Sequence, residues 1–219
     1  VLTELNANVS FTDEAVTDET NSLTDDPAVF TTGNVSDAYA DLFTSFTTEN
    51  TTSTQPSGVG PVMLDSVSSL LNANGEPLTN DSVVAVSAES TATNSDTDGN
   101  GDAVSYPSGT DIPVVAVDGS VVGVTGPFVA SDTNFSYGNE EIMLNIYDEL
   151  LRGSGTIVHD EGHGQFYTLA SNGGDDFQEF ASYAEANGYT YEATTNVTAN
   201  LSSADAVVIT SPSDAYTQS

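Results

Sequence analysis

Basic residues are almost absent from this chain, which has no lysine and a single arginine, Arg152, against 33 aspartates and glutamates. The formal net charge is −32 at pH 7. Such a surface repels nucleic-acid phosphates, so the charge disfavours DNA and RNA, and we expect no nucleic-acid partner. In dilute buffer the carboxylates repel one another, whereas in molar salt the Debye length falls to about 3 Å. The composition therefore predicts a protein adapted to brine, typical of a halophilic archaeon. A calcium-loaded secreted protein is the alternative, but it does not explain the missing lysine.

Cysteine is also absent, which excludes disulfides, thiolate zinc sites and a cysteine nucleophile. No apolar run is long enough to cross a bilayer, so we expect no direct membrane insertion. The hydrophobic fraction is nevertheless 37%, and Val, Ile, Leu and Tyr occur in blocks. A disordered acidic chain would lack such blocks, so the sequence predicts a folded domain.

Seven N-x-S/T sequons indicate a glycosylated surface, and hence an extracellular or cell-surface location. The acceptor residues are Asn8, Asn34, Asn50, Asn80, Asn134, Asn196 and Asn200. A chain rich in Asn, Ser and Thr also forms sequons by chance, and that alternative stays open.

Local patterns predict several helices and strands. Val-rich runs on either side of Asp118-Gly119 predict a hairpin over 113–130. A one-sided apolar stripe predicts a helix over 138–152. Residues 154–219 read as a β-α-β succession. We therefore expect an α/β fold with a mostly parallel open sheet flanked by helices, of the flavodoxin kind, and an irregular β-rich N-terminal part.

Three C-terminal strings resemble a known domain: HDEGHGQFYT at 159–168, FQEFASYAEANGYTYEATT at 177–195 and SADAVVITSPSDAYT at 203–217. They are similar to the first half of a GIFT-type domain, a relative of the class I glutamine-amidotransferase fold found in haloarchaeal secreted and cell-surface proteins. IPVVAVDGSVVGVTGPFV at 112–129 and FSYGNEEIMLNIYDELL at 135–151 resemble the end of that domain. Its middle is resembled by LNANVSFTDEAVTDETN and PAVFTTGNV.

The halves of this domain stand in permuted order. Residues 1–153 resemble the second half and residues 154–219 the first half. A lone β-α-β unit cannot cover its own sheet faces, so we expect a neighbouring copy to complete it. The predicted partner is therefore another copy of the chain, in a homo-oligomer or polymer assembled by split-domain complementation. A fragment of a longer tandem array and a permuted single domain are the alternatives.

The HDEGH string holds both histidines of the chain and is the main candidate site. Asp160, Glu161 and His163 are candidate ligand-binding residues for two reasons. Histidine and carboxylate side chains bind metal ions, and these three residues stand at the end of a predicted buried strand, where open sheets bind ligands. Gly162 and Gly164 favour a turn over the helix that an H-E-x-x-H metal site needs. We therefore prefer a structural or ligand-binding role to catalysis, and predict no catalytic residue, since no serine triad or cysteine is present.

The acidic loop at 94–102 resembles the start of a calcium loop. Oxygen-bearing side chains alternate at Asp96, Asp98, Asn100 and Asp102. Pro107 stands where the bidentate glutamate of an EF-hand would be. Calcium is therefore a tentative cofactor, and a solvated loop is the alternative.

Together these patterns predict a non-catalytic, extracellular structural, assembly or binding protein, such as part of a surface layer, a filament or a multidomain surface protein. Two alternatives remain: an accessory or catalytic piece of a secreted metal-dependent nuclease or hydrolase, and a carbohydrate-binding module.

Overall fold

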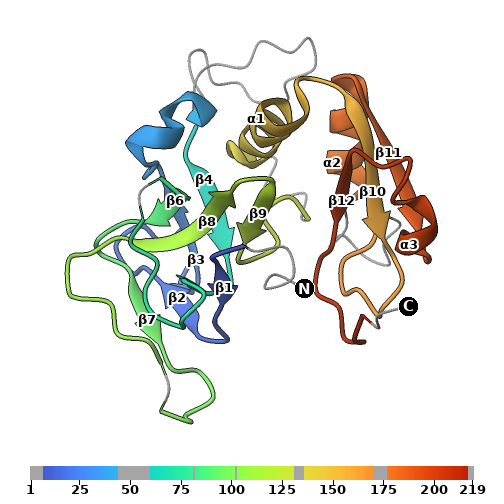
Figure 1. The fold of residues 1–219 in the computed structure, drawn as a ribbon. Coiled ribbons are helices and arrows are strands. Elements are labelled where there is room, and N and C mark those ends of the chain that lie inside the picture. The colour runs from blue at the N-terminus through green and yellow to red at the C-terminus, as the bar shows by residue number, and fades with distance from the viewer. Residues whose placement is uncertain are drawn as a thin grey trace. The chain divides into compact units, whose positions relative to one another are not determined.

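A computed structural model describes residues 7–43, 60–80, 82–101, 103–130, 136–169 and 177–216 (Figure 1). The chain packs as two compact units. Unit 1 comprises Val1–Thr44 and Ser57–Phe128, and unit 2 comprises Ser45–Pro56 and Val129–Ser219. These units are defined by contacts within the fold, whereas the division expected after residue 153 was based on the resemblance of the sequence strings.

Unit 1 is built from short antiparallel strand pairs. The two-stranded pairs are β1 (Ser10–Phe11) with β5 (Leu70–Leu71), β2 (Ala15–Thr17) with β7 (Thr93–Ser95), and β3 (Val29–Thr32) with β4 (Val62–Asp65). A three-stranded sheet has the order β6 (Val84–Ala88), β8 (Ile112–Asp118), β9 (Val121–Val124). A 3-10 helix, η1 (Asp37–Phe43), lies between β3 and β4 in the chain.

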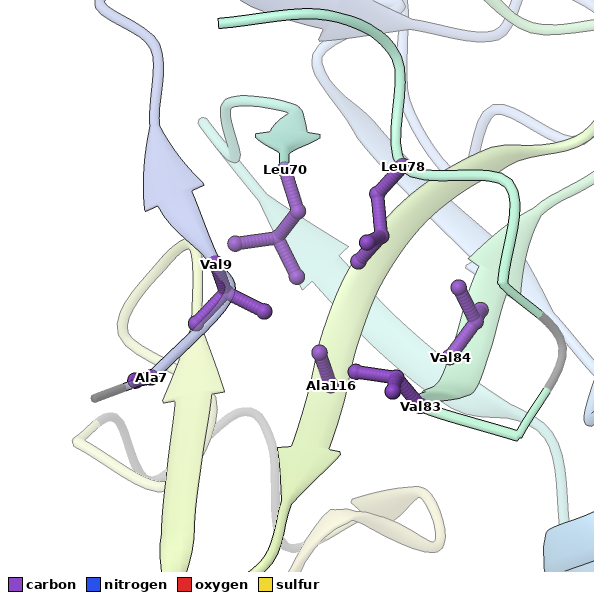
Figure 2. Packing of buried hydrophobic residues seen from close by; sticks show 7 residues of the cluster. All are labelled: Ala7, Val9, Leu70, Leu78, Val83, Val84 and Ala116. Carbon is purple, nitrogen blue, oxygen red and sulfur yellow. The ribbon is translucent and has the colours of Figure 1, made fainter. Parts of the chain in front are cut away.

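The predicted hairpin over 113–130 is confirmed as the β8–β9 pair. Gly119 has φ +63°, which the tight turn after Asp118 requires and which glycine adopts without steric cost. Every residue of β8 except Asp118 is buried, so this strand lies at the centre of the unit. One hydrophobic cluster of the unit is shown in Figure 2; its members are Ala7, Val9, Leu70, Leu78, Val83, Val84 and Ala116.

Unit 2 contains a parallel β-α-β-α-β succession. Its elements are α1 (Asn139–Leu151), β10 (Gly155–Asp160), α2 (Gln178–Ala186), β11 (Tyr189–Thr194), α3 (Val197–Asn200) and β12 (Ala206–Val208). The three strands run parallel in the order β11-β10-β12. The predicted β-α-β succession is thus present, with β10 in the middle.

The helix predicted over 138–152 is confirmed as α1. Ile142, Leu144 and Ile146 are buried, and Arg152 ends the helix in the left-handed conformation at φ +61°. The Tyr147 hydroxyl lies 2.8 Å from that of Tyr191 on β11, which links the helix to the parallel sheet.

The fold class expected from the sequence is wrong. The described residues form twelve strands, mostly in small antiparallel sheets, and only three belong to a parallel sheet. A parallel pair needs a crossover of a dozen or more residues, usually an α-helix. Within the described part of unit 1 no α-helix separates the strands, so they pair antiparallel. None of the described helices has the length and apolar character needed to cross a bilayer.

Candidate functional site

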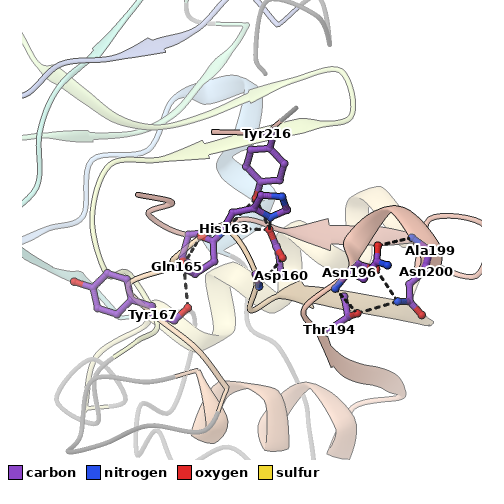
Figure 3. A network of polar contacts seen from close by, with 11 residues as sticks. Asp160, His163, Gln165, Tyr167, Thr194, Asn196, Ala199, Asn200 and Tyr216 are labelled. Atoms are coloured by element: carbon purple, nitrogen blue, oxygen red, sulfur yellow. Dashed lines mark hydrogen bonds and ion pairs between the residues drawn. The ribbon is translucent and has the colours of Figure 1, made fainter. Parts of the chain in front are cut away.

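A buried carboxylate at the end of β10 organises the candidate site (Figure 3). The Asp160 side chain is fully buried, and its Oδ1 accepts a hydrogen bond from the Gly162 backbone N–H at 2.9 Å. Its Oδ2 accepts from His163 Nδ1 at 2.8 Å, from Gln165 Nε2 at 3.1 Å and from the Tyr216 hydroxyl. We call Asp160, Gly162, His163, Gln165 and Tyr216 the Asp160 network.

The protonation states in this network follow from its donors. Burial acts to raise the pKa of the Asp160 carboxyl, but hydrogen bonds, first those from Tyr216 and His163, outweigh it, so the pKa lies below its ordinary value. Burial and the neighbouring carboxylate raise the pKa of the Tyr216 hydroxyl. Asp160 is therefore an anion surrounded by donors, and Tyr216 is a neutral donor.

His163 is held in a fixed orientation. Its ring stacks on that of Tyr216, with centroids 3.9 Å apart and planes 24° apart. Its backbone has φ +57°, a left-handed conformation that costs on the order of 1 kcal/mol for a residue other than glycine. Its side chain is 25% exposed, and Nδ1 is the nitrogen that faces Asp160. The ring is thus fixed at one nitrogen and partly open to solvent.

Two glycines let the loop after β10 approach its neighbours closely. A Cβ added to Gly162 would lie 2.7 Å from the backbone oxygen of Thr195, and one added to Gly164 would clash with Ser213 Oγ. Gly164 also has φ +62°. A side chain at either position would displace the loop that carries His163.

Hydrogen bonds connect this network to the segment after β12. Gln165 Oε1 accepts from the Thr210 backbone N–H at 3.0 Å and from its Oγ1 at 2.9 Å. The Tyr167 backbone oxygen accepts from His159 Nε2 at 3.0 Å and also lies 3.0 Å from Thr210 Oγ1, whose single proton it shares with Gln165 Oε1. The loop after β10 and the segment after β12 are therefore fastened together by side chains.

The two histidines have different environments. His159 is fully buried and packs edge-to-face on Phe177, with ring centroids 4.9 Å apart. Burial lowers its pKa, so the ring is neutral and its Nε2 donates to the Tyr167 carbonyl. His163 instead contacts Asp160. Among the described residues, no three His, Asp or Glu side chains are grouped as a metal site.

The structure brings together two of the three predicted site residues. Asp160 and His163 are bonded directly, whereas Glu161 Oε1 accepts from the Leu169 backbone N–H at 3.0 Å. Sequence reasoning missed the other network members, Gln165 and Tyr216. Their signals were weak, since Gln165 lies beyond the HDEGH string and Tyr216 lies 56 residues from Asp160 in the chain.

The Asp160 network lies where an open parallel sheet commonly binds ligands. In the sheet order β11-β10-β12, the next strand of the chain, β11, lies on one side of β10, and the strand after it, β12, lies on the other side. Ligands bind outside the carboxyl ends of strands at such a change of direction. Asp160 ends β10, and Thr210 and Tyr216 follow β12. The topology thus permits a ligand site here, and the side chains decide its chemistry.

Donors within the predicted calcium loop form hydrogen bonds with the carboxylates of Asp96 and Asp98. Asp96 accepts from the backbone N–H groups of Gly101 at 2.9 Å and Gly99 at 2.7 Å, and these bonds lower the pKa of its carboxyl. Asn100 Nδ2 donates to Asp98 Oδ2 at 2.9 Å. Asp102 lies outside the described residues. Calcium binding by this loop stays a prediction.

Five of the seven sequon asparagines are described, and Asn50 and Asn134 lie outside the described residues. Asn8, Asn80 and Asn196 are exposed. Asn34 and Asn200 are partly buried, and Asn200 Nδ2 donates to Thr194 Oγ1 at 2.9 Å (Figure 3). Exposure leaves the first three accessible for a glycan, while glycosylation itself stays a prediction.

The resemblance to a GIFT-type domain rests on the sequence strings alone and stays a prediction. No protein-family model, curated protein or solved structure matches the chain.

Proposed function

We propose that this chain is a non-catalytic, extracellular structural or binding module adapted to high salt, which assembles with copies of itself. The observation that carries the non-catalytic part of this proposal is the state of the Asp160 carboxylate, which is fully buried and accepts four hydrogen bonds from its own chain. A carboxylate with this many donors has little capacity left for a metal ion. The most distinctive string of the sequence therefore serves to fasten two segments of the fold.

The charge supports the adaptation to salt. Asp160–His163 is the contact between a carboxylate and a basic side chain that the described residues show, and the single arginine is exposed. The 33 acids of the sequence face one arginine and two histidines, so few of them can have a basic partner. Such a surface needs external cations to screen it. The exposed sequon asparagines and the absence of cysteine are compatible with an extracellular surface.

One observation favours a second candidate, a secreted hydrolase. Asp160 contacts Nδ1 of His163, so the ring is oriented as a carboxylate orients a general base, with its other nitrogen on the far side of the ring. The ring is 25% exposed and lies at the carboxyl edge of the sheet. This candidate needs a nucleophile or a metal-bound water near His163, and the described residues group no metal ligands there.

A comparison of wild type with His163→Ala separates the two candidates. Both proteins are dialysed exhaustively in molar salt, their metal content is measured, and hydrolysis of nucleic-acid, phosphoester, ester and peptide substrates is assayed. Glu185→Gln is the matched control, because Glu185 is exposed on α2 and is not one of the candidate site residues. We expect no stoichiometric transition metal and no turnover in any of the three. One equivalent of metal, or turnover, that is present in wild type and lost in His163→Ala would instead establish the hydrolase.

A further inference from the structure

The parallel sheet of unit 2 has two edges of different chemistry. β11 and β12 are the outer strands, and within the described residues neither pairs with a strand on its far side. β11 carries the exposed polar residues Thr190 and Glu192. β12 consists of half-buried Ala206, Val207 and Val208. Edge strands are commonly protected from pairing by charged side chains, and β12 has none.

Two exposed apolar side chains lie close to β12 or directly after it. Ile209, directly after β12, is 39% exposed, and Phe166 is 72% exposed. The Phe166 backbone N–H donates to the Ser211 carbonyl at 3.2 Å, which places Phe166 beside the continuation of β12. We call Phe166 together with residues 206–209 the β12 strip.

The β12 strip lies in an uncharged part of an acidic chain. Between residues 193 and 213 the sequence has one acid, Asp205, although 33 of its 219 residues are acidic and about three would be expected in such a stretch. The carboxylate of Asp205 is bonded within the fold, because its Oδ2 accepts from the Thr156 backbone N–H at 2.8 Å. Within the described residues the strip therefore combines an edge strand with no partner on its far side, apolar side chains and few acids along β12 and its flanks.

We propose that the β12 strip is the contact through which two copies of this chain associate, with β12 pairing antiparallel with β12 of the second copy. This inference rests on the proposed assembly function and deepens it. The pairing would join two three-stranded sheets into one sheet of six. A twofold contact of this kind uses the same surface on both partners, so it needs one self-complementary patch only.

The charge identifies the occupant as a second copy. Two chains of net charge −32 repel over most of their surfaces, so contact between them is most favourable where both carry few acids. A twofold pairing through β12 brings one neutral strip against another. A basic partner would instead be attracted to the acidic faces. Molar salt screens the remaining repulsion and strengthens apolar burial, so dimerisation should increase with salt as well as with concentration.

Single cysteines test the contact cleanly, because the native chain has none. Ala206→Cys, Val207→Cys and Val208→Cys are prepared alongside Leu201→Cys, whose site is 54% exposed but lies outside the strip. Directly opposed residues of an antiparallel pair have Cβ atoms about 4.5–5.5 Å apart, close to disulfide geometry. In molar salt we expect at least one β12 variant to form a disulfide-linked dimer about tenfold or more faster than Leu201→Cys, through a higher effective concentration.

Sedimentation velocity in molar salt provides the second readout. Ile209→Asp should shift the protein towards monomer, whereas Leu201→Asp should leave the dimer intact. A wild-type protein that is monomeric at all concentrations, or β12 cysteines that cross-link no faster than Leu201→Cys, would overturn the β12 contact. A folded, metal-free monomer would overturn the β12 contact but would still be consistent with a non-catalytic role of the module. A dimer that binds metal and turns over substrate would overturn that role and keep the contact.

Discussion

Transfer from molar salt to dilute buffer is expected to abolish the cooperative fold of this chain. At low ionic strength the field of 33 carboxylates, opposed by one arginine, is unscreened across distances of tens of ångströms. Folding confines these charges to a compact surface, so their repulsion acts against the folded state. We expect it to exceed the net stability of about 5–15 kcal/mol that is typical of folded proteins. This is the largest effect that the sequence predicts.

Far-ultraviolet circular dichroism and thermal unfolding, recorded across a series of NaCl and KCl concentrations, measure this effect. Both salts should restore the fold to a similar extent, since screening depends mainly on ionic strength. Sucrose at matched water activity is the control, because it favours compact states without screening charge. A cooperative transition that survives in buffer without salt would rule out the adaptation to brine.

Asp160→Asn is expected to have the largest effect of any single substitution in unit 2. The asparagine amide would present N–H donors to a site that already contains donors from His163, Gln165 and Tyr216. Each hydrogen bond to a charged group contributes about 1.5–3 kcal/mol, and buried donors left without an acceptor add to the cost. We expect the free energy of unfolding in molar salt to fall by about 3 kcal/mol.

The effect of Asp160→Asn should depend on pH. The pKa of Asp160 is lowered in the folded state, so its contribution to stability is fully present above the pKa of about 3.9 of the unfolded chain and is lost as pH falls through the folded value. Wild type and Asp160→Asn should therefore converge in acid. The matched control is Asp111→Asn at an exposed position, which should change the stability by less than about 0.5 kcal/mol. Equal stability of Asp160→Asn and Asp111→Asn at neutral pH would contradict the role of Asp160.

Local patterns predicted the elements that depend on local interactions. The 138–152 helix is specified by its apolar stripe and by the left-handed Arg152 that ends it. The β8–β9 hairpin is specified by Asp118-Gly119, since few residues tolerate the turn's positive φ. In both cases the deciding contacts join residues close together in the chain, so the sequence carries the signal directly.

The fold class depended on pairings that no local pattern contains. Val16 on β2 pairs with Asn94 on β7, almost eighty residues away, and Ser10 pairs with Leu71. The strands of both pairs are only two or three residues long. Short strands have too few positions for their alternation to reveal a partner. The β-α-β pattern of residues 154–219 and the family resemblance therefore decided the expected sheet, and both extended the parallel arrangement of unit 2 to the rest of the chain.

The candidate site was located from the sequence but not completed. The predicted strand end and glycine turn placed Asp160 and His163 near each other, as the structure shows. Tyr216 lies 56 residues from Asp160 in the chain and meets it because β10 and β12 are neighbours in the sheet. The hydrogen bond from Tyr216 to the Asp160 carboxylate therefore depends on the strand order, which only the three-dimensional structure provides.

A double-mutant cycle between Asp160→Asn and Tyr216→Phe tests most directly whether the Asp160 carboxylate fastens the segments after β10 and β12. The free energy of unfolding in molar salt is measured for wild type, both single variants and the double variant. We predict a coupling energy of about 1–2 kcal/mol, because each substitution removes the partner of the other. A cycle of Asp160→Asn with Tyr147→Phe, whose hydroxyl bonds Tyr191 instead, should be nearly additive. Additivity within about 0.5 kcal/mol in the first cycle would contradict the structural role of the network.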